Sequence, residues 1–143
     1  RLLLVYPCVP YESVWGFKVT ERRANDRLLK AKTRLASYPN IEFIRKSSME
    51  ALADVPDGSL GFVYIDGLHD FDNAMLDVIH WSKKVRPSGV VAGHDYWKMH
   101  GGQVTSVIDA YTRAHGINEW YITRDKGPSW FSIRALGAVR RGG

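Results

Sequence analysis

The chain has 143 residues, of which 45% are hydrophobic and 12% aromatic, and its formal net charge is +5. This size and apolar content suffice to bury the core of one domain and argue against intrinsic disorder. No apolar run reaches the roughly 18 residues of a membrane span, and the single cysteine, Cys8, excludes an internal disulfide and a cysteine-cluster zinc site. We therefore expect a single cytoplasmic domain over residues 1–143 with no membrane partner. Because the chain opens at Arg1 directly on an apolar run, we also expect this domain to be incomplete at its N-terminus.

The charges are distributed unevenly along the chain. Residues 16–46 contain nine Lys or Arg and three Asp or Glu, whereas residues 47–82 contain seven acidic residues and no Lys or Arg. A basic segment can attract a polyanion, but a solvated helix face explains it more simply, so we do not expect nucleic acid as a partner. The acidic segment indicates either a solvated face or a binding site for a cation.

In chain order, the apolar pattern predicts an alternation of strands and helices. The first strand ends at Val5, and a helix over residues 27–37 follows, with Asn25 or Asp26 as its N-cap. Ser48 is predicted to cap a short helix that ends at Ala53. The remaining predicted elements are strands over residues 41–45, 62–65, 90–92, 119–123 and 130–134, and helices over residues 71–82 and 104–114.

The connections between these elements indicate the fold class. Residues 62–65 are continuously apolar, which is typical of a strand covered on both faces. Asp70 or Asp72 is expected to cap the helix that follows, and the Arg-Pro-Ser-Gly sequence over residues 86–89 is expected to form a turn. The alternation predicts an α/β fold, with a Rossmann-like, mostly parallel sheet, helices on both faces and a C-terminal antiparallel hairpin.

Two of the predicted strands end in polar clusters. One runs into Asp66, Gly67 and His69, and the next runs into His94 and Asp95. In an open parallel sheet, ligands bind beyond the carboxyl ends of the strands. We therefore expect Asp66, His94 and Asp95 to converge at one rim of the sheet, with His69 on the loop just above.

This set of side chains suits a divalent cation. Carboxylate oxygens with waters favour Mg²⁺, Ca²⁺ or Mn²⁺, and an imidazole makes Mn²⁺ or another transition metal possible. A histidine beside carboxylates also suits proton abstraction. Each residue has a simpler explanation, because Asp66 and Asp70 could cap the following helix and His94 could be a core histidine. For the whole set, placed at two strand ends, we favour a functional site.

Other residues carry weaker signals. Cys8 is expected to be a buried small residue and not a nucleophile. Trp15, Trp97 and Trp130 could line a pocket, although core packing is the commoner use of an aromatic ring. His100, which precedes two glycines, could belong to a lid or to an anion-binding helix start.

Two segments resemble the class I S-adenosylmethionine-dependent methyltransferases, and most closely the small branch called methyltransferase family 24. They are VPDGSLGFVYIDGLHDFDN over residues 55–73 and HWSKKVRPSGVVAGHDYW over residues 80–97. The resemblance implies that the strand ending at Asp66 is the fourth of the family's sheet. It also implies that the family's first strand and glycine-rich loop are absent from this chain.

The resemblance further implies S-adenosylmethionine as a cofactor. Ser47, Ser48 and Met49 lie where the family contacts adenine, and Tyr6 stands where the family has an acidic residue that binds the ribose hydroxyls. The cofactor-binding residues implied are Tyr6, Ser47, Ser48, Met49, Asp66 and Gly67.

For the substrate half, the resemblance implies a metal site for Mg²⁺ or Mn²⁺ formed by Asp66, His94 and Asp95. His69 would be a candidate base, and the catalytic residues implied are His69, Asp66 and His94. Such a metal would lower the pKa of a substrate hydroxyl and hold it in line with the donor methyl group. The expected reaction is O-methylation of a small molecule or a sugar.

Two alternatives stay open. The first is a non-catalytic methyltransferase-fold module, whose exposed sheet edge or basic segment would bind a partner. The second is a metal-dependent hydrolase or oxygenase on a similar sheet, with Asp66, His94 and Asp95 as ligands. For the oligomeric state, a homodimer is the default expectation.

Overall fold

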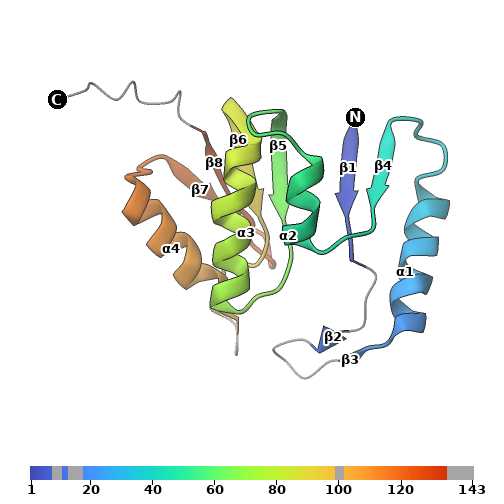
Figure 1. The fold of residues 1–143 in the computed structure, drawn as a ribbon. Helices are drawn as coiled ribbons and strands as arrows, with labels where there is room; N and C mark the ends of the chain where they lie inside the picture. The colour runs from blue at the N-terminus through green and yellow to red at the C-terminus, as the bar shows by residue number, and fades with distance from the viewer. Residues whose placement is uncertain (8–10, 13–17, 99–101, 135–143) are drawn as a thin grey trace. The chain divides into compact units, whose positions relative to one another are not determined.

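The structure is a computed structural model that describes residues 1–7, 11–12, 18–98 and 102–134. The chain separates into two compact units, Arg1–Asp54 and Val55–Gly143, each of which is described by itself (Figure 1). The single domain over residues 1–143 stays a prediction. Among the described residues, every helix is too short or too polar to cross a lipid bilayer. Cys8, Trp15, His100 and Gly101 lie outside the described residues.

The first unit is built on a parallel strand pair. β1 (Leu2–Val5) and β4 (Ile41–Ile44) pair in register, with Leu2 opposite Ile41. A small core forms where Tyr6 and Leu28 pack against Val19 and Ala24. The other elements of this unit are β2 (Tyr11–Glu12), β3 (Lys18–Val19), α1 (Glu21–Arg34), α2 (Ser48–Ala51) and the 3-10 helix η1 (Leu52–Asp54).

Both predicted helix starts in this unit were wrong. Helix α1 begins at Glu21, because Thr20 is its N-cap and the Thr20 side chain accepts a hydrogen bond from the Arg23 amide. The earlier start brings Ala24, which is fully buried, into the helix. Helix α2 is capped by Ser47, where a reciprocal capping box with Glu50 satisfies two amides at the helix start.

The second unit is a four-stranded sheet with two helices. Strands β5 and β6 are parallel, and β8 pairs antiparallel with both β6 and β7, which gives the order β5-β6-β8-β7. The elements are β5 (Leu60–Ile65), α3 (Phe71–Lys84), β6 (Val85–Gly93), α4 (Val104–His115), β7 (Trp120–Ile122) and β8 (Trp130–Ile133). This arrangement confirms the predicted α/β fold with parallel strands and a C-terminal antiparallel hairpin.

Residues 86–89 form an irregularity inside β6, where a turn was predicted. Leu60 pairs with Val85 and Phe62 pairs with Val90, so the β6 side carries the extra residues as a bulge. Ser88 adopts a left-handed backbone with φ 61° inside this bulge. Turns also place residues in this left-handed conformation, which explains why a turn-type sequence suits the bulge.

The core of the second unit lies on one face of this sheet. Helices α3 and α4 contribute Val78, Val107 and Ile108, which pack against Val91 and Trp130 of the strands. On the other face, the side chains of Phe62 and Tyr64 remain 56% and 46% exposed. The prediction that this strand is covered on both faces was therefore wrong for these two rings. Strand periodicity explains the result, because residues 62 and 64 point away from the face that α3 and α4 cover.

Candidate functional site

The candidate site lies where β5 and β6 end side by side. Ile65 pairs with Gly93 at the last position of the two strands, and the His94 amide donates to the Ile65 carbonyl oxygen at 3.0 Å. Asp66 follows the first strand, and His94 and Asp95 follow the second. The structure therefore brings all three side chains to one edge of the sheet.

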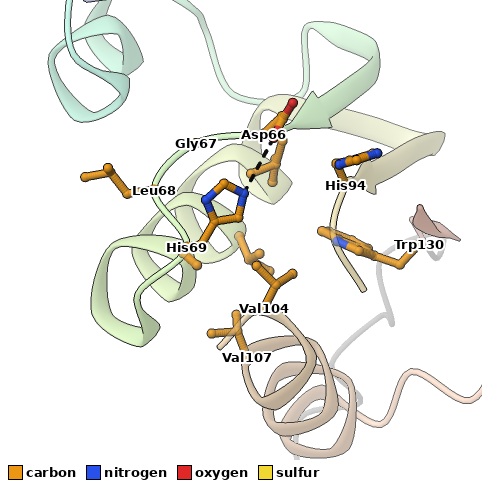
Figure 2. A pocket seen from close by; sticks show the side chains of 11 residues that line it. Asp66, Gly67, Leu68, His69, His94, Val104, Val107 and Trp130 are labelled. Atoms are coloured by element: carbon orange, nitrogen blue, oxygen red, sulfur yellow. Dashed lines mark ion pairs between the residues drawn. The ribbon is translucent and has the colours of Figure 1, made fainter. Parts of the chain in front are cut away.

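His69 joins this cluster through its Nε2 atom. This nitrogen lies 2.7 Å from Oδ2 of Asp95 and 3.8 Å from Oδ1 of Asp66, the second contact being drawn in Figure 2. The His69 and Asp95 side chains are 18% and 14% exposed, whereas the Asp66 side chain is 56% exposed. The site is thus a largely buried imidazole–carboxylate pair with a second carboxylate facing solvent.

Asp95 links two imidazoles. Its Oδ1 atom lies 2.9 Å from Nδ1 of His94 and accepts a hydrogen bond from Nε1 of Trp97 at 3.1 Å, while its Oδ2 atom faces His69. Burial raises the pKa of Asp95, but hydrogen bonds from His94, Trp97 and His69 outweigh it, and the net pKa lies below its ordinary value. The carboxyl group is therefore ionised at neutral pH.

The backbone of Asp95 is in the left-handed region, with φ 59°. Residues other than glycine rarely adopt this conformation, and it concentrates at functional sites. Here it turns the chain sharply after β6, so that the carboxylate faces both His69 and His94.

Three side chains could hold a metal ion together. One ligand atom each from Asp66, His69 and Asp95 lies within 4.8 Å of the others. The predicted set contained His94 in place of His69. Among the described residues, His94 instead contacts Asp95 through Nδ1.

The loop that carries Asp66 and His69 is fixed at its far end. Asp70 is the N-cap of α3 and accepts a hydrogen bond from the Asn73 amide at 3.0 Å, as predicted for one of the two candidate caps. Burial raises the pKa of Asp70, but hydrogen bonds from Asn73 outweigh it, and the net pKa is lowered. Gln103, which precedes α4, holds the loop by two hydrogen bonds of 2.9 Å. Its backbone N–H donates to the His69 carbonyl oxygen, and its side-chain Oε1 accepts from the Phe71 backbone N–H.

Gly67 lets this loop approach the buried side of α3. A Cβ atom at Gly67 would lie 2.6 Å from Oδ2 of Asp77, closer than any ordinary contact. Asp77 is only 6% exposed, so its carboxylate lies directly beneath the loop. Any residue other than glycine would push the loop and this carboxylate apart.

A small cavity opens beneath the cluster. Figure 2 shows its lining, with His94 and Trp130 on one side, His69 on the other, and Val104 of α4 below. Its volume is about 20 Å³. Trp130 therefore both packs in the core and lines a cavity, the two uses that the sequence left open.

The predicted adenine and ribose contacts belong to the first unit. Ser47 caps α2, and its Oγ atom lies 2.6 Å from the Glu50 carboxylate. Ser48 and Met49 are half-buried in the first turn of α2. Tyr6 packs on the small core, and its buried hydroxyl has no hydrogen-bond partner among the described residues.

A family model described as a methyltransferase domain, family 24, matches residues 8–96. The chain belongs to this family. The match confirms the class I methyltransferase family that the segments around Asp66 and Asp95 predicted. It spans the cluster residues Asp66, His69, His94 and Asp95 and ends before α4.

Solved structures with the same fold include methyltransferases. The O-methyltransferase NovP superposes with a TM-score of 0.64 at 15% identity, covering 93% of this chain and 59% of that chain. A putative O-methyltransferase from Klebsiella pneumoniae gives a TM-score of 0.53 at 11% identity, over 94% of this chain and 62% of that one. Cofactor-bound Rv0187 from MTB superposes with a TM-score of 0.55 at 12% identity, covering 79% of this chain and 58% of that chain. At these identities the likeness shows the methyltransferase fold.

A sequence relative is the uncharacterized protein y4gI of Sinorhizobium fredii, which is 36% identical over 77 residues. The match covers 54% of this chain and 7% of that protein. The chain thus spans a small part of y4gI and about three fifths of the similar structures.

The sequence interpretation missed two residues that support the candidate site, Asp77 and Gln103. Asp77 carried a usable signal, because it lies on the apolar stripe of α3, three positions after Ala74 and four before Trp81. An acidic residue on a buried helix face needs a specific partner. Gln103 carried no such signal, since its role depends on the approach of α4 to the His69 loop.

Proposed function

We propose that this methyltransferase-family chain transfers the methyl group of S-adenosylmethionine to a hydroxyl oxygen of a small molecule or sugar, with help from a divalent cation. The observation that carries the proposal is the cluster of Asp66, His69 and Asp95 at the carboxyl ends of two parallel strands. In open α/β sheets this edge is where ligands bind. O-methyltransferases among the proteins of the same fold support hydroxyl oxygen as the acceptor atom.

The donor set fits a divalent cation. It offers two carboxylates and one imidazole whose ligand atoms lie within 4.8 Å of one another. Carboxylates suit Mg²⁺ and Mn²⁺, and the imidazole favours Mn²⁺ or another transition metal over Mg²⁺. Such a cation would lower the pKa of the acceptor hydroxyl and fix its position. Because His69 Nε2 faces the Asp95 carboxylate, cation binding at that nitrogen requires the loss of its proton.

His94 is the residue that we assign as the base in this reaction. Its Nδ1 atom faces Oδ1 of Asp95, and an ionised carboxylate only accepts, so the proton belongs on Nδ1. In the neutral imidazole, Nε2 is then the nitrogen without a proton. A Cβ at Gly127 would lie 3.2 Å from this Nε2, so the glycine keeps the hairpin from crowding it. Asp95 thus orients the imidazole, as carboxylates commonly do for catalytic histidines.

The bonds and charges balance in this scheme. The S–CH₃ bond of the sulfonium breaks, an O–CH₃ bond forms, and the hydroxyl proton moves to Nε2 of His94. The sulfonium loses its positive charge as a neutral thioether leaves. Asp66, His69 and Asp95 hold the acceptor side of the site, whereas Ser47, Ser48, Met49 and Tyr6 are proposed, from the family resemblance, to contact the cofactor.

Calorimetry of the purified chain tests the proposal. S-adenosylmethionine is titrated with and without Mn²⁺, into the native sequence, into Asp66→Asn and into the control Asp72→Asn, an exposed acid in the first turn of α3. Cofactor binding to the native chain, with Mn²⁺ binding lost in Asp66→Asn and kept in Asp72→Asn, supports the proposal. Mn²⁺ binding without any cofactor binding would favour a metal-dependent hydrolase or oxygenase. Binding of neither by a folded chain would favour a non-catalytic module.

A further inference from the structure

Trp130 carries a buried hydrogen-bond donor without a partner. This residue of β8 is 4% exposed, and its Nε1–H has no acceptor within reach among the described residues. An indole nitrogen only donates, and a buried donor left unsatisfied is rare in folded proteins. A ligand that accepts one hydrogen bond would satisfy this group.

Gly93 leaves room for this indole. Gly93 and Trp130 are paired across β6 and β8, and a Cβ at Gly93 would lie 2.7 Å from Cζ2 and 2.8 Å from Cε2 of the ring. The ring therefore occupies the space that a side chain at Gly93 would need, directly before His94 and Asp95. A substitution at Gly93 would displace the indole from this position.

The indole borders the cavity beneath the cluster. Figure 2 shows Trp130 on one side of the cavity, with Asp66 and His69 across from it and Val104 and Val107 of α4 below. The volume of about 20 Å³ is enough for one water molecule. Carboxylate and imidazole groups on the wall supply the further polar partners that a buried water needs.

We infer that this cavity binds a single water molecule, which accepts a hydrogen bond from Trp130 Nε1–H and donates to a carboxylate or imidazole on the cavity wall. The water connects the core of the second unit to the loop that carries Asp66 and His69. This inference does not depend on the proposed methyl transfer, since it concerns the protein without substrate or cofactor.

Nuclear magnetic resonance of the ¹⁵N-labelled chain tests the inference. The indole N–H signal of Trp130 is assigned by its loss in Trp130→Phe, and cross-relaxation between this proton and water is then measured in the native chain. A long-lived water gives nuclear Overhauser effects of opposite sign in the laboratory and rotating frames. The indole of Trp97 is the internal control, because its side chain is exposed and its Nε1–H already donates to Asp95 Oδ1.

A cavity-filling variant locates the water. Val104→Ile adds one methyl group to the cavity wall, so the Trp130 cross-peak with water is expected to disappear while the indole N–H signal remains. A folded native chain whose Trp130 N–H shows no long-lived water contradicts the inference. An unchanged cross-peak in folded Val104→Ile also contradicts it, because the water would then lie outside this cavity.

Discussion

Nε2 of His69 lies 2.7 Å from Oδ2 of Asp95, although 26 positions separate the two residues in the chain. The pair joins the loop after β5 to the turn after β6, and Asp66 faces the same nitrogen at 3.8 Å. If these groups form a metal site, His69→Gln removes the one nitrogen ligand that the described residues supply to it. We expect Mn²⁺ affinity to fall by about 100-fold or more, since loss of even an outer partner of a metal ligand commonly costs about 10–100-fold.

Calorimetric titration of Mn²⁺ into the native chain, His69→Gln and His115→Gln measures this effect. His115 is exposed in the last turn of α4 and serves as the matched control, whose substitution is expected to leave the affinity unchanged. Equal affinities for all three chains would remove His69 from the metal site.

Gly67→Ala is expected to lower the free energy of unfolding by about 1–3 kcal/mol, the usual cost of overpacking a close contact. The added Cβ would lie 2.6 Å from Oδ2 of Asp77, which is buried, so the carboxylate or the loop must shift. Gly61→Ala is the control, because its Cβ would meet only the Arg86 side chain, at 3.6 Å. Urea unfolding of the three chains gives the comparison, and similar losses for both variants would contradict the close approach of Gly67 to Asp77.

The sequence predicted which strands end at the site because strand ends are marked locally. Asp66 and Asp95 each follow an apolar run, and parallel neighbours must end at the same edge. The side chain that faces both carboxylates was harder to predict. His69 is turned toward them by a loop fixed by the Asp70 cap and by Gln103, 34 positions away from His69 in the chain.

In the first unit, the start of helix α1 likewise depended on a tertiary contact that local sequence does not show. Asn25, Asp26 and Thr20 are all competent N-caps, so composition alone does not choose among them. A tertiary contact that favours the observed start is the burial of Ala24 against Val19, because a helix capped by Asn25 or Asp26 would leave Ala24 outside. Local patterns thus identified the helix, and packing set its first turn.

Ser47→Ala is expected to cost about 1 kcal/mol of stability, because it removes an N-cap side chain. The Ser47 hydroxyl and amide hold the pKa of Glu50 below its ordinary value, so the variant should raise that pKa toward the normal range. Thermal unfolding and a carboxyl titration by nuclear magnetic resonance measure the two effects. Ser47→Asn keeps a capping oxygen and is expected to retain the native stability. A loss of stability in Ser47→Asn would mean that the Ser47 hydroxyl stabilises the protein by a contact other than the N-cap hydrogen bond.

Tyr96→Phe is expected to change how stability responds to alkaline pH. The Tyr96 hydroxyl donates to Oδ1 of Asp109 at 2.6 Å, and burial together with this carboxylate raises the pKa of Tyr96 from 10.0 to about 12. A group whose pKa is higher in the folded state than in the unfolded state stabilises the folded protein. This stabilisation is complete at a pH below the unfolded-state pKa, and it is lost as the pH rises through the folded-state pKa. The native chain should therefore lose stability between pH 10 and about 12 through Tyr96, and Tyr96→Phe should not.

Urea unfolding across this pH range isolates the effect as a difference between the two chains, since lysines and the other tyrosines titrate in both. Tyr121→Phe, at a 49% exposed position of β7, is the control and should follow the native curve. The native chain is expected to have a higher free energy of unfolding than Tyr96→Phe, by an amount that is constant below pH 10 and shrinks above it. A difference that stays constant up to about pH 12 would mean that the Tyr96–Asp109 hydrogen bond does not hold the phenol proton.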